Sequence, residues 1–348
     1  MSGLPCRLGG RPESLVIALL ASVPASGGPA PPRVGPLVTV LLLLAVGICG
    51  CSTQDTLGRY KAARTLHLAP DGRLIVADQG TGKHDGAVVA VDTVNHKRTV
   101  VLQNLPSTHN SGQAHADLAG PSGAGMAPDG TVCAVIGDAT TQNAGFATLR
   151  CTDGLVVDLE AFQARSRLPS NPYDVVSDGL DGWYVSDGAA NNVLHVNRAG
   201  EVMVVARFPS LAATGLGGRD GQGVPTGLTL GPDRTLYVAL YGGAPFDGPP
   251  AAVVSLAPDA ATRPTMVKPK LLALMPHPIA LALTPDGLAV VDYSDAQAET
   301  SSPERARPSR LLASGLDRPT GLARLPDGRW AVAESGHSRL KILTGRPA

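Results

Sequence analysis

The sequence predicts an all-β protein, a single six-bladed β-propeller of four-stranded antiparallel blades. The first observation behind this is a hairpin unit, clearest at Pro225–Ala239, in which two short apolar strands flank a tight turn containing proline and aspartate. The second is repetition, because six versions of the unit occur at intervals of 41 to 58 residues, the length of four short strands with loops. The turn aspartates are Asp71, Asp129, Asp181, Asp233, Asp286 and Asp327.

Size and composition fit one closed ring. The chain has 348 residues, and its 41 glycines and 30 prolines suit many tight turns, while aromatic residues make up only 3%. Lys plus Arg and Asp plus Glu both number 29, so the formal net charge is zero. Bulk charge therefore recruits neither nucleic acid nor an anionic surface, and the composition excludes coiled coils and helical solenoids.

Residues 1–54 are predicted to be a leader and a disordered N-terminus, and residues 55–348 the propeller. Pro36–Gly50 is an apolar stretch of about 15 residues, the length of a signal-peptide core. The motif Ile48-Cys49-Gly50-Cys51 resembles a bacterial lipobox, which implies lipidation of Cys51. The alternative is a signal anchor in which the cysteines are incidental. In both cases we expect an exported protein at the cell membrane, facing outside the cytoplasm.

The blades are expected to follow one another along the chain. Blade 6 has only three strands before the chain ends, which would leave an unpaired edge in the ring. We therefore expect Thr56–Arg64 to complete it from the amino-terminal side. The predicted blades are residues 66–119, 120–170, 171–224, 225–277, 278–318, and 319–348 together with 56–64.

Blade 2 carries Cys133 and Cys151 on neighbouring predicted strands. In an exported protein the two form a disulfide if their side chains face the same side of the sheet. Otherwise they are buried thiols, each packing as a small apolar side chain. The sequence leaves both readings open.

Polar residues stand where the innermost strand of each blade begins. In a propeller these strands line the channel, so residues entering them gather around one mouth and can form a site for a metal or a small polar ligand. Plainer readings are solvent-exposed loop histidines, a turn at Asn171, which precedes a proline, and a carboxylate at Asp174 that caps backbone amides. The predicted ligand-binding residues are His115, Asp117, Asn171, Tyr173, Asp174, Thr226, His277 and Arg318.

Acidic residues close the second strand of most repeats. Because they recur with the repeat, we expect them to bond loop amides rather than hold a metal. The chain contains no G-x-S-x-G, H-E-x-x-H, C-x-x-C or Walker motif, so the common nucleophile and metalloprotease signatures are missing. The recurring acidic residues are Asp78, Asp138, Asp187, Asp292 and Glu334.

Ser170–Val176, Trp183–Val205 and Val224–Phe246 resemble the ScyD/ScyE family of exported bacterial propellers. The resemblance implies a six-bladed propeller related to NHL repeats and no settled activity, so no catalytic residue follows from it. A remoter likeness to gluconolactonase and senescence-marker propellers implies a divalent cation, such as Ca²⁺, held in the channel by Glu, Asn and Asp. Asn171 and Asp174 are the predicted metal ligands, whereas Arg64 stands near the position of the glutamate.

Two functions follow from this sequence. The first is a lipid-anchored binding module of the cell envelope that recognises a small molecule, a glycan or an envelope protein at the channel mouth, and binds no nucleic acid. The second is a hydrolase or lactonase that depends on a divalent cation in the same channel. A structural assembly platform is a third reading, for which Phe246 and its neighbouring prolines would provide an apolar rim.

Overall fold

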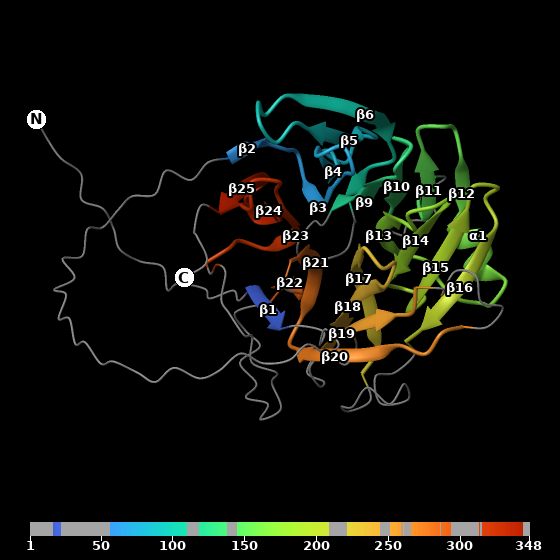
Figure 1. The fold of residues 1–348 in the computed structure, drawn as a ribbon. Coiled ribbons are helices and arrows are strands. Elements are labelled where there is room, and N and C mark those ends of the chain that lie inside the picture. Colours follow the sequence, from blue (N-terminus) through green and yellow to red (C-terminus); the bar gives the residue numbers. More distant parts are fainter. Residues whose placement is uncertain are drawn as a thin grey trace, which may run out of the picture.

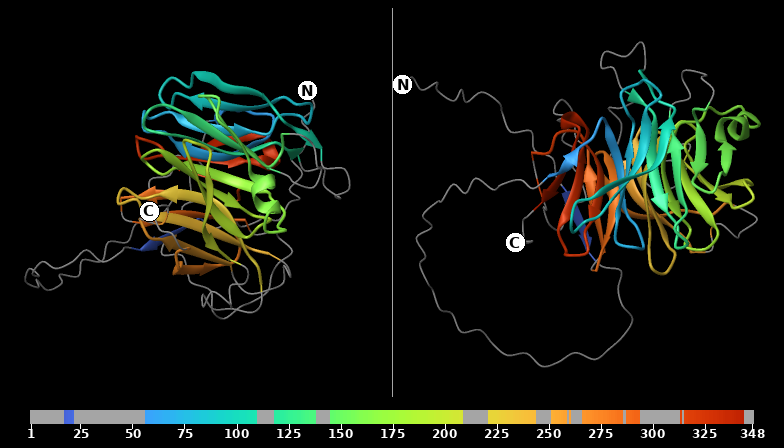
Figure 2. Two further views of the ribbon diagram at one scale, coloured as in Figure 1. Left: turned by 90° about the vertical axis from the view of Figure 1, so that its right-hand side faces the viewer. Right: turned by 90° about the horizontal axis from the view of Figure 1, so that it is seen from above.

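The chain folds as a β-propeller of four-stranded antiparallel blades around a central axis (Figure 1). The structure is a computed structural model. Views at right angles to Figure 1 show the sheets stacked around that axis (Figure 2). The structure describes residues 17–21, 56–109, 118–137, 145–208, 221–243, 251–258, 260, 266–285, 287–293, 313 and 315–343.

Five blades have four strands each within the described residues. Blade 1 consists of β3 (Ala63–Leu68), β4 (Leu74–Asp78), β5 (Gly86–Val91) and β6 (Arg98–Leu105). Blade 2 consists of β9 (Pro121–Met126), β10 (Val132–Ile136), β11 (Thr148–Cys151) and β12 (Val156–Asp158). Blade 3 consists of β13 (Pro172–Ser177), β14 (Gly182–Asp187), β15 (Asn192–Asn197) and β16 (Val202–Arg207).

The remaining two complete blades use the same order from the channel outward. Blade 4 consists of β17 (Gly223–Leu230), β18 (Leu236–Gly242), β19 (Ala251–Leu256) and β20 (Lys270–Met275). Blade 6 consists of β23 (Pro319–Arg324), β24 (Trp330–Glu334), β25 (Arg339–Leu343) and β2 (Thr56–Arg59). Short connecting elements are β7 (Thr108–His109), β8 (Leu118–Ala119), α1 (Leu159–Ala164) and the 3-10 helix η2 (Ser335–His337).

The fifth repeat differs from the prediction of four strands. Its two described strands, β21 (Pro278–Thr284) and β22 (Gly287–Asp292), form a hairpin, and β1 (Ile17–Ala21) pairs antiparallel with β22. The sheet therefore has three strands, and the next part of the repeat, residues 294–312, lies outside the described residues. We refer to the β21–β22 hairpin as repeat 5.

Blade 6 takes its outer strand from the amino-terminal side of the ring. β2 runs antiparallel to β25, with Arg59 opposite Arg339. The sequence placed this strand at Thr56–Arg64, but it ends at Arg59 because Ala63 already begins the inner strand of blade 1. Both ends of the described ring therefore lie in one sheet.

The core is divided among the interfaces between sheets. Six clusters of buried apolar side chains join blades 1 and 2, 2 and 3, 3 and 4, blade 4 and repeat 5, repeat 5 and blade 6, and blades 6 and 1. Successive residues of a strand point to opposite faces, so Trp183 of β14 packs toward blade 2 and Tyr184 toward blade 4. Each sheet is thus held by both of its neighbours.

The repeated Thr-Gly dipeptide of the inner strands brings neighbouring sheets close together. Thr226 Oγ1 donates to the carbonyl of Pro278 at 3.2 Å, and a Cβ on Gly227 would lie only 2.7 Å from the Cα of Ala280. Thr320 Oγ1 likewise donates to a carbonyl of blade 1 at 3.0 Å. The hydroxyl links adjacent sheets, and the missing side chain of glycine leaves room for the next backbone.

The repeated turn is closed by its aspartate. Asp71 Oδ1 accepts from the backbone N–H of Arg73 at 3.0 Å, and Gly72 between them has a left-handed φ of 83°. In blade 4 the corresponding left-handed residue is Arg234, with φ 65°. The same bond from a turn aspartate to the second residue after it occurs at Asp129, Asp233 and Asp327.

The disulfide reading of Cys133 and Cys151 is confirmed. The two residues are directly opposite each other on β10 and β11, and a disulfide joins them. The alternative of two free thiols is therefore wrong. Both cysteines are buried within the apolar cluster between blades 2 and 3.

The predicted leader stays a prediction. Pro36–Gly50 and Cys51 lie outside the described residues, as does the rim residue Phe246. Of the helices that the structure does describe, none combines the length and apolar character needed to cross a bilayer.

Candidate functional site

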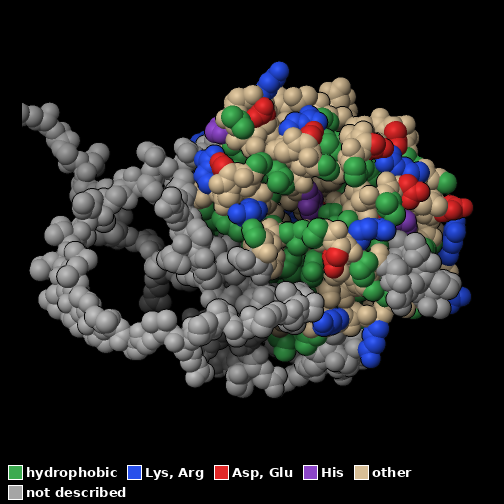
Figure 3. All heavy atoms as spheres, in the orientation of Figure 1, with side chains coloured by type: hydrophobic (Ala, Val, Ile, Leu, Met, Phe, Trp, Pro, Cys, Tyr) green, Lys and Arg blue, Asp and Glu red, His purple; other side chains and the backbone are tan. Residues whose placement is uncertain are grey.

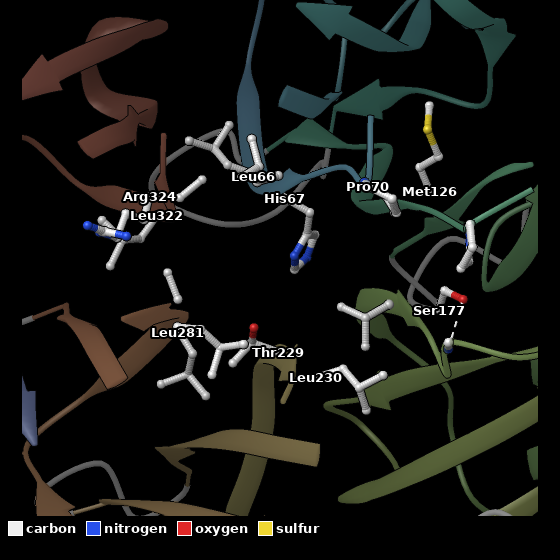
Figure 4. Close-up of a pocket in the computed structure, with 18 residues that line it drawn as sticks. Leu66, His67, Pro70, Met126, Ser177, Thr229, Leu230, Leu281, Leu322 and Arg324 are labelled. Carbon is white, nitrogen blue, oxygen red and sulfur yellow. Dashed lines mark hydrogen bonds between the residues drawn. The ribbon is translucent and has the colours of Figure 1, made fainter. Parts of the chain in front are cut away.

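A cavity of about 340 Å³ lies at the end of the channel where the inner strands finish and enter their turns. We call it the turn-side cavity. All six inner strands line it, and each of them contributes at least one apolar side chain to its wall (Figure 4). These side chains are Leu66, Met126, Val176, Leu230, Leu281 and Leu322.

The turn-side cavity is mainly apolar, with few polar side chains. His67 points into its middle, while Ser177, Thr229 and Arg324 lie around it (Figure 4). In the orientation of Figure 1, hydrophobic side chains gather around the middle of the ring, and most Lys and Arg side chains lie further out (Figure 3). An apolar pocket with a few directed polar groups is the usual form of a small-molecule site.

His67 is held by a buried carboxylate from a blade that is not its neighbour. Its Nε2 lies 2.8 Å from Oδ1 of Asp174, whose side chain is 2% exposed. His67 belongs to blade 1 and Asp174 to blade 3, so with blade 2 between them the pair meets in the channel. When Asp174 is ionised it can only accept, so Nε2 donates and Nδ1 is the ring nitrogen left for a ligand.

Asp174 also fastens the inner strands to one another. Its Oδ2 accepts from the backbone N–H of Leu228 on β17 at 2.9 Å, and its Oδ1 accepts from that of Val175 at 2.8 Å. Both carboxylate oxygens therefore have protein donors. The sequence left two readings of Asp174, a ligand for a metal or substrate and a carboxylate that caps backbone amides. The hydrogen bonds fit the second reading, and through them the carboxylate joins blades 1, 3 and 4.

The other predicted site residues are not among those that line the turn-side cavity. His115 and Asp117 lie outside the described residues. Thr226 is buried in the contact with repeat 5. Asn171 and Arg318 are exposed at the other end of the channel, where the inner strands begin.

Tyr173 and His277 belong to an aromatic group at that entry end. The ring of His277 lies 5.0 Å from that of Tyr241, which lies 6.4 Å from Tyr293. Burial raises the pKa of Tyr173 to about 12, with Arg64 acting in the opposite direction and Asp174 and Tyr293 adding to the rise. We call Arg64, Tyr173, Tyr241, His277 and Tyr293 the entry cluster.

The expectation for the recurring acidic residues is confirmed where they are described. Asp78 accepts from the backbone of Lys61 and Ala62 at 3.1 and 2.7 Å, and three others accept loop amides in the same way. Burial raises the pKa of Asp187 although Ser170 and the backbone of Asn171 donate to it. The other three are Asp187, Asp292 and Glu334, while Asp138 lies outside the described residues.

The predicted metal pair is Asn171 and Asp174. Within the part of the chain that the structure describes, no three His, Cys, Asp or Glu residues are grouped as a metal site. The backbone N–H of Asn171 donates to Asp187 at 2.8 Å, and Asp174 uses its oxygens as described above. Asn171 and Asp174 as metal ligands therefore stay a prediction.

Sequence reasoning missed His67 and Arg64. His67 interrupts an otherwise apolar unit, L-H-L-A-P-D-G, at a position where the equivalent units of repeat 5 and blade 6 have alanine. A polar residue at one position of an apolar repeat is a signal that could have identified it. Arg64 stood out only as a departure from the lactonase pattern.

Comparisons with known proteins show the fold. No family model matches the chain, and no curated protein matches it. A Bacteroides thetaiotaomicron structural genomics protein of unknown function is 12% identical, with a TM-score of 0.51 over 83% of this chain and 71% of that chain. An auxiliary nutrient binding protein from the same species is 10% identical, with a TM-score of 0.49 over 95% and 76%.

A third similar structure is described as a putative gluconolactonase. It is 13% identical and has a TM-score of 0.47 over 84% of this chain and 92% of that chain. At these identities a structural similarity shows the fold at most and no activity. The propeller expected from the sequence is shown by the arrangement of the sheets, while the narrower resemblance to the ScyD/ScyE family is not shown.

Proposed function

We propose that this protein is an exported six-bladed propeller, tethered to the membrane, that binds a small molecule with an apolar body in the turn-side cavity. The cavity itself carries the proposal. Its volume of about 340 Å³ is in the range of small-molecule pockets, and its walls come from every inner strand, so the site is rigid and already formed.

The lining indicates the chemistry of the ligand. Apolar side chains from six strands favour a hydrocarbon or aromatic body, because its burial releases water from both surfaces. His67, fixed by Asp174, offers one directed hydrogen bond through Nδ1. Arg324 supplies a positive charge to the same lining. A small apolar acid or alcohol satisfies all three features.

Two features support export and tethering. Disulfides persist in oxidising compartments, and the Cys133–Cys151 bridge is of this kind. The lipobox-like sequence ending at Cys51 supports a lipid anchor, with an uncleaved signal anchor as the alternative. A place within the ScyD/ScyE family is consistent with both features.

The His67–Asp174 pair also favours a second function, hydrolysis of a lactone or related ester in the turn-side cavity. A carboxylate that fixes one nitrogen of a histidine leaves the other available as a general base. Such a base could activate water against an apolar lactone held by the surrounding leucines. A divalent cation remains part of this alternative, as the sequence suggested.

Binding can be tested by titration calorimetry with octanoate and octanol as probes. We expect saturable binding of both to the wild type, weakened about tenfold or more in Leu230→Trp, which fills the cavity. The matched control is Val100→Trp on β6, where the side chain is 55% exposed and outside the cavity, and binding should be unchanged. Equal affinities in both variants, or no saturable binding, would contradict the proposal.

Hydrolysis is distinguished from binding with one further variant. His67→Gln should abolish any turnover of an apolar lactone while octanol still binds. If the wild type binds the probes but turns over no lactone, the protein is a binding module and the hydrolase alternative is wrong.

A further inference from the structure

Arg64 is a channel-facing cation without a counter-ion in the described structure. It lies on β3, the inner strand of blade 1, and is half-buried. Its guanidinium lies 5.3 Å from the ring centroid of Tyr173. Among the described residues its buried Nε has no hydrogen-bond partner, and its guanidinium forms no ion pair with a carboxylate. A charge removed from water is normally paired, so this position favours an anion from outside the chain.

Tyr173 places a second donor beside it. The hydroxyl of Tyr173 is buried and has no hydrogen-bond partner among the described residues. Because burial raises its pKa to about 12, the hydroxyl keeps its proton at neutral pH and can donate. Buried polar groups nearly always have partners, so two neighbouring donors without acceptors indicate where an acceptor would bind.

The acidic residue next to Tyr173 in the sequence does not serve as that acceptor. Asp174 follows Tyr173 on β13, but both of its oxygens accept from His67, Leu228 and Val175. Its negative charge is thus committed to joining the inner strands. The donors of Arg64 and Tyr173 remain for a ligand.

The surroundings of these donors are aromatic. Arg64 comes from blade 1 and Tyr173 from blade 3, so with blade 2 between them their side chains meet within the channel. Tyr293 follows β22, and it packs with Tyr173 against the apolar cluster between repeat 5 and blade 6. Tyr241 and His277 extend the aromatic surface toward blade 4 and repeat 5.

We propose that the entry cluster is a second binding site, which takes the carboxylate of a small aromatic acid. The planar guanidinium of Arg64 can donate two parallel hydrogen bonds to the two oxygens of a carboxylate. This geometry favours planar anions over spherical ones. Tyr173 donates to the same group, and the rings of Tyr241 and Tyr293 pack against the aromatic body. This site is separate from the turn-side cavity, because none of its residues lines that cavity.

Titration calorimetry with benzoate tests the site. Wild type should bind benzoate saturably and benzamide, the neutral analogue, at least about tenfold more weakly. Arg64→Gln should weaken benzoate binding about tenfold or more, and Tyr173→Phe about threefold to tenfold. Arg207→Gln is the matched control, since Arg207 lies on β16, the outermost strand of blade 3, outside both sites, and the substitution should leave benzoate binding unchanged.

Three results would overturn the proposal. They are no saturable benzoate binding by the wild type, equal binding by wild type and Arg64→Gln, and binding of inorganic phosphate in preference to benzoate. Tyr173→Phe keeps the ring that packs under Arg64, so it remains a test of the donor even if Arg64→Gln fails to fold. Loss of octanoate binding in Leu230→Trp with benzoate binding intact would show that the two sites are independent.

Discussion

Replacing Asp174 by alanine should destabilise the ring far more than replacing a turn aspartate. In the wild type the carboxylate accepts from His67, Leu228 and Val175, which belong to three inner strands. The substitution leaves the backbone N–H of Leu228, a fully buried residue, without that acceptor. It also removes the group that holds His67 across the channel.

The expected loss follows from these bonds. A buried donor left without an acceptor costs about 1–3 kcal/mol, and losing a hydrogen bond to a charged group costs about 1.5–3 kcal/mol. The contributions overlap because they share one carboxylate, so we expect about 3–5 kcal/mol for Asp174→Ala. Asp233→Ala is the control, because Asp233 is exposed and bonds only within its own turn, and we expect about 1 kcal/mol.

The difference in unfolding free energy between the two variants and the wild type is measured from the midpoints of urea unfolding. This requires that the slope of the unfolding free energy against urea concentration is the same in all three proteins. A double-mutant cycle of Asp174→Ala with His67→Ala then isolates the energy of that one pair. If Asp174→Ala lies within about 1 kcal/mol of wild type, the carboxylate does not join the strands as described. A role as ligand would then become the better explanation of its position.

Two further predictions concern stability. Replacing Cys133 and Cys151 together by serine removes a cross-link that closes 18 residues, so the unfolding free energy should fall by about 3 kcal/mol in urea; an unchanged midpoint would argue against the bridge. Burial raises the pKa of Tyr60 and Tyr173 from 10.0 to about 12, so their contribution to stability is complete below pH 10 and is lost as pH rises toward 12. Between pH 10 and 12 the unfolding free energy should fall less steeply with pH for the double variant Tyr60→Phe, Tyr173→Phe than for the wild type. Parallel curves for the two proteins would contradict the burial of these tyrosines.

The architecture was predictable because it repeats. The Pro-Asp turn with flanking apolar strands encodes a local hairpin, and local hydrogen bonds such as that from Arg73 to Asp71 keep it the same in each blade. The recurring acidic residue at the end of the second strand also bonds locally, as Asp78 does to Lys61 and Ala62. Such interactions leave a periodic trace in the sequence.

The site was harder to predict because it is built from single residues of different repeats. Asp174 pairs with His67 across 107 positions, and no periodic pattern records that distance. The inner strands were identified correctly, but periodicity does not tell which end of the channel holds a cavity. The prediction followed the entry end, whereas the cavity that the structure describes lies at the turns.

The contact between blades 6 and 1 has a consequence for how the protein folds. Thr320 donates to the carbonyl of Arg64 across 256 positions, and the apolar cluster around it combines the first and last parts of the ring. Such distant pairings form late, since much chain entropy must be lost first. During synthesis or translocation the early blades therefore have open sheet edges until β23, β24 and β25 emerge, and chaperones that shield edges would act in that interval.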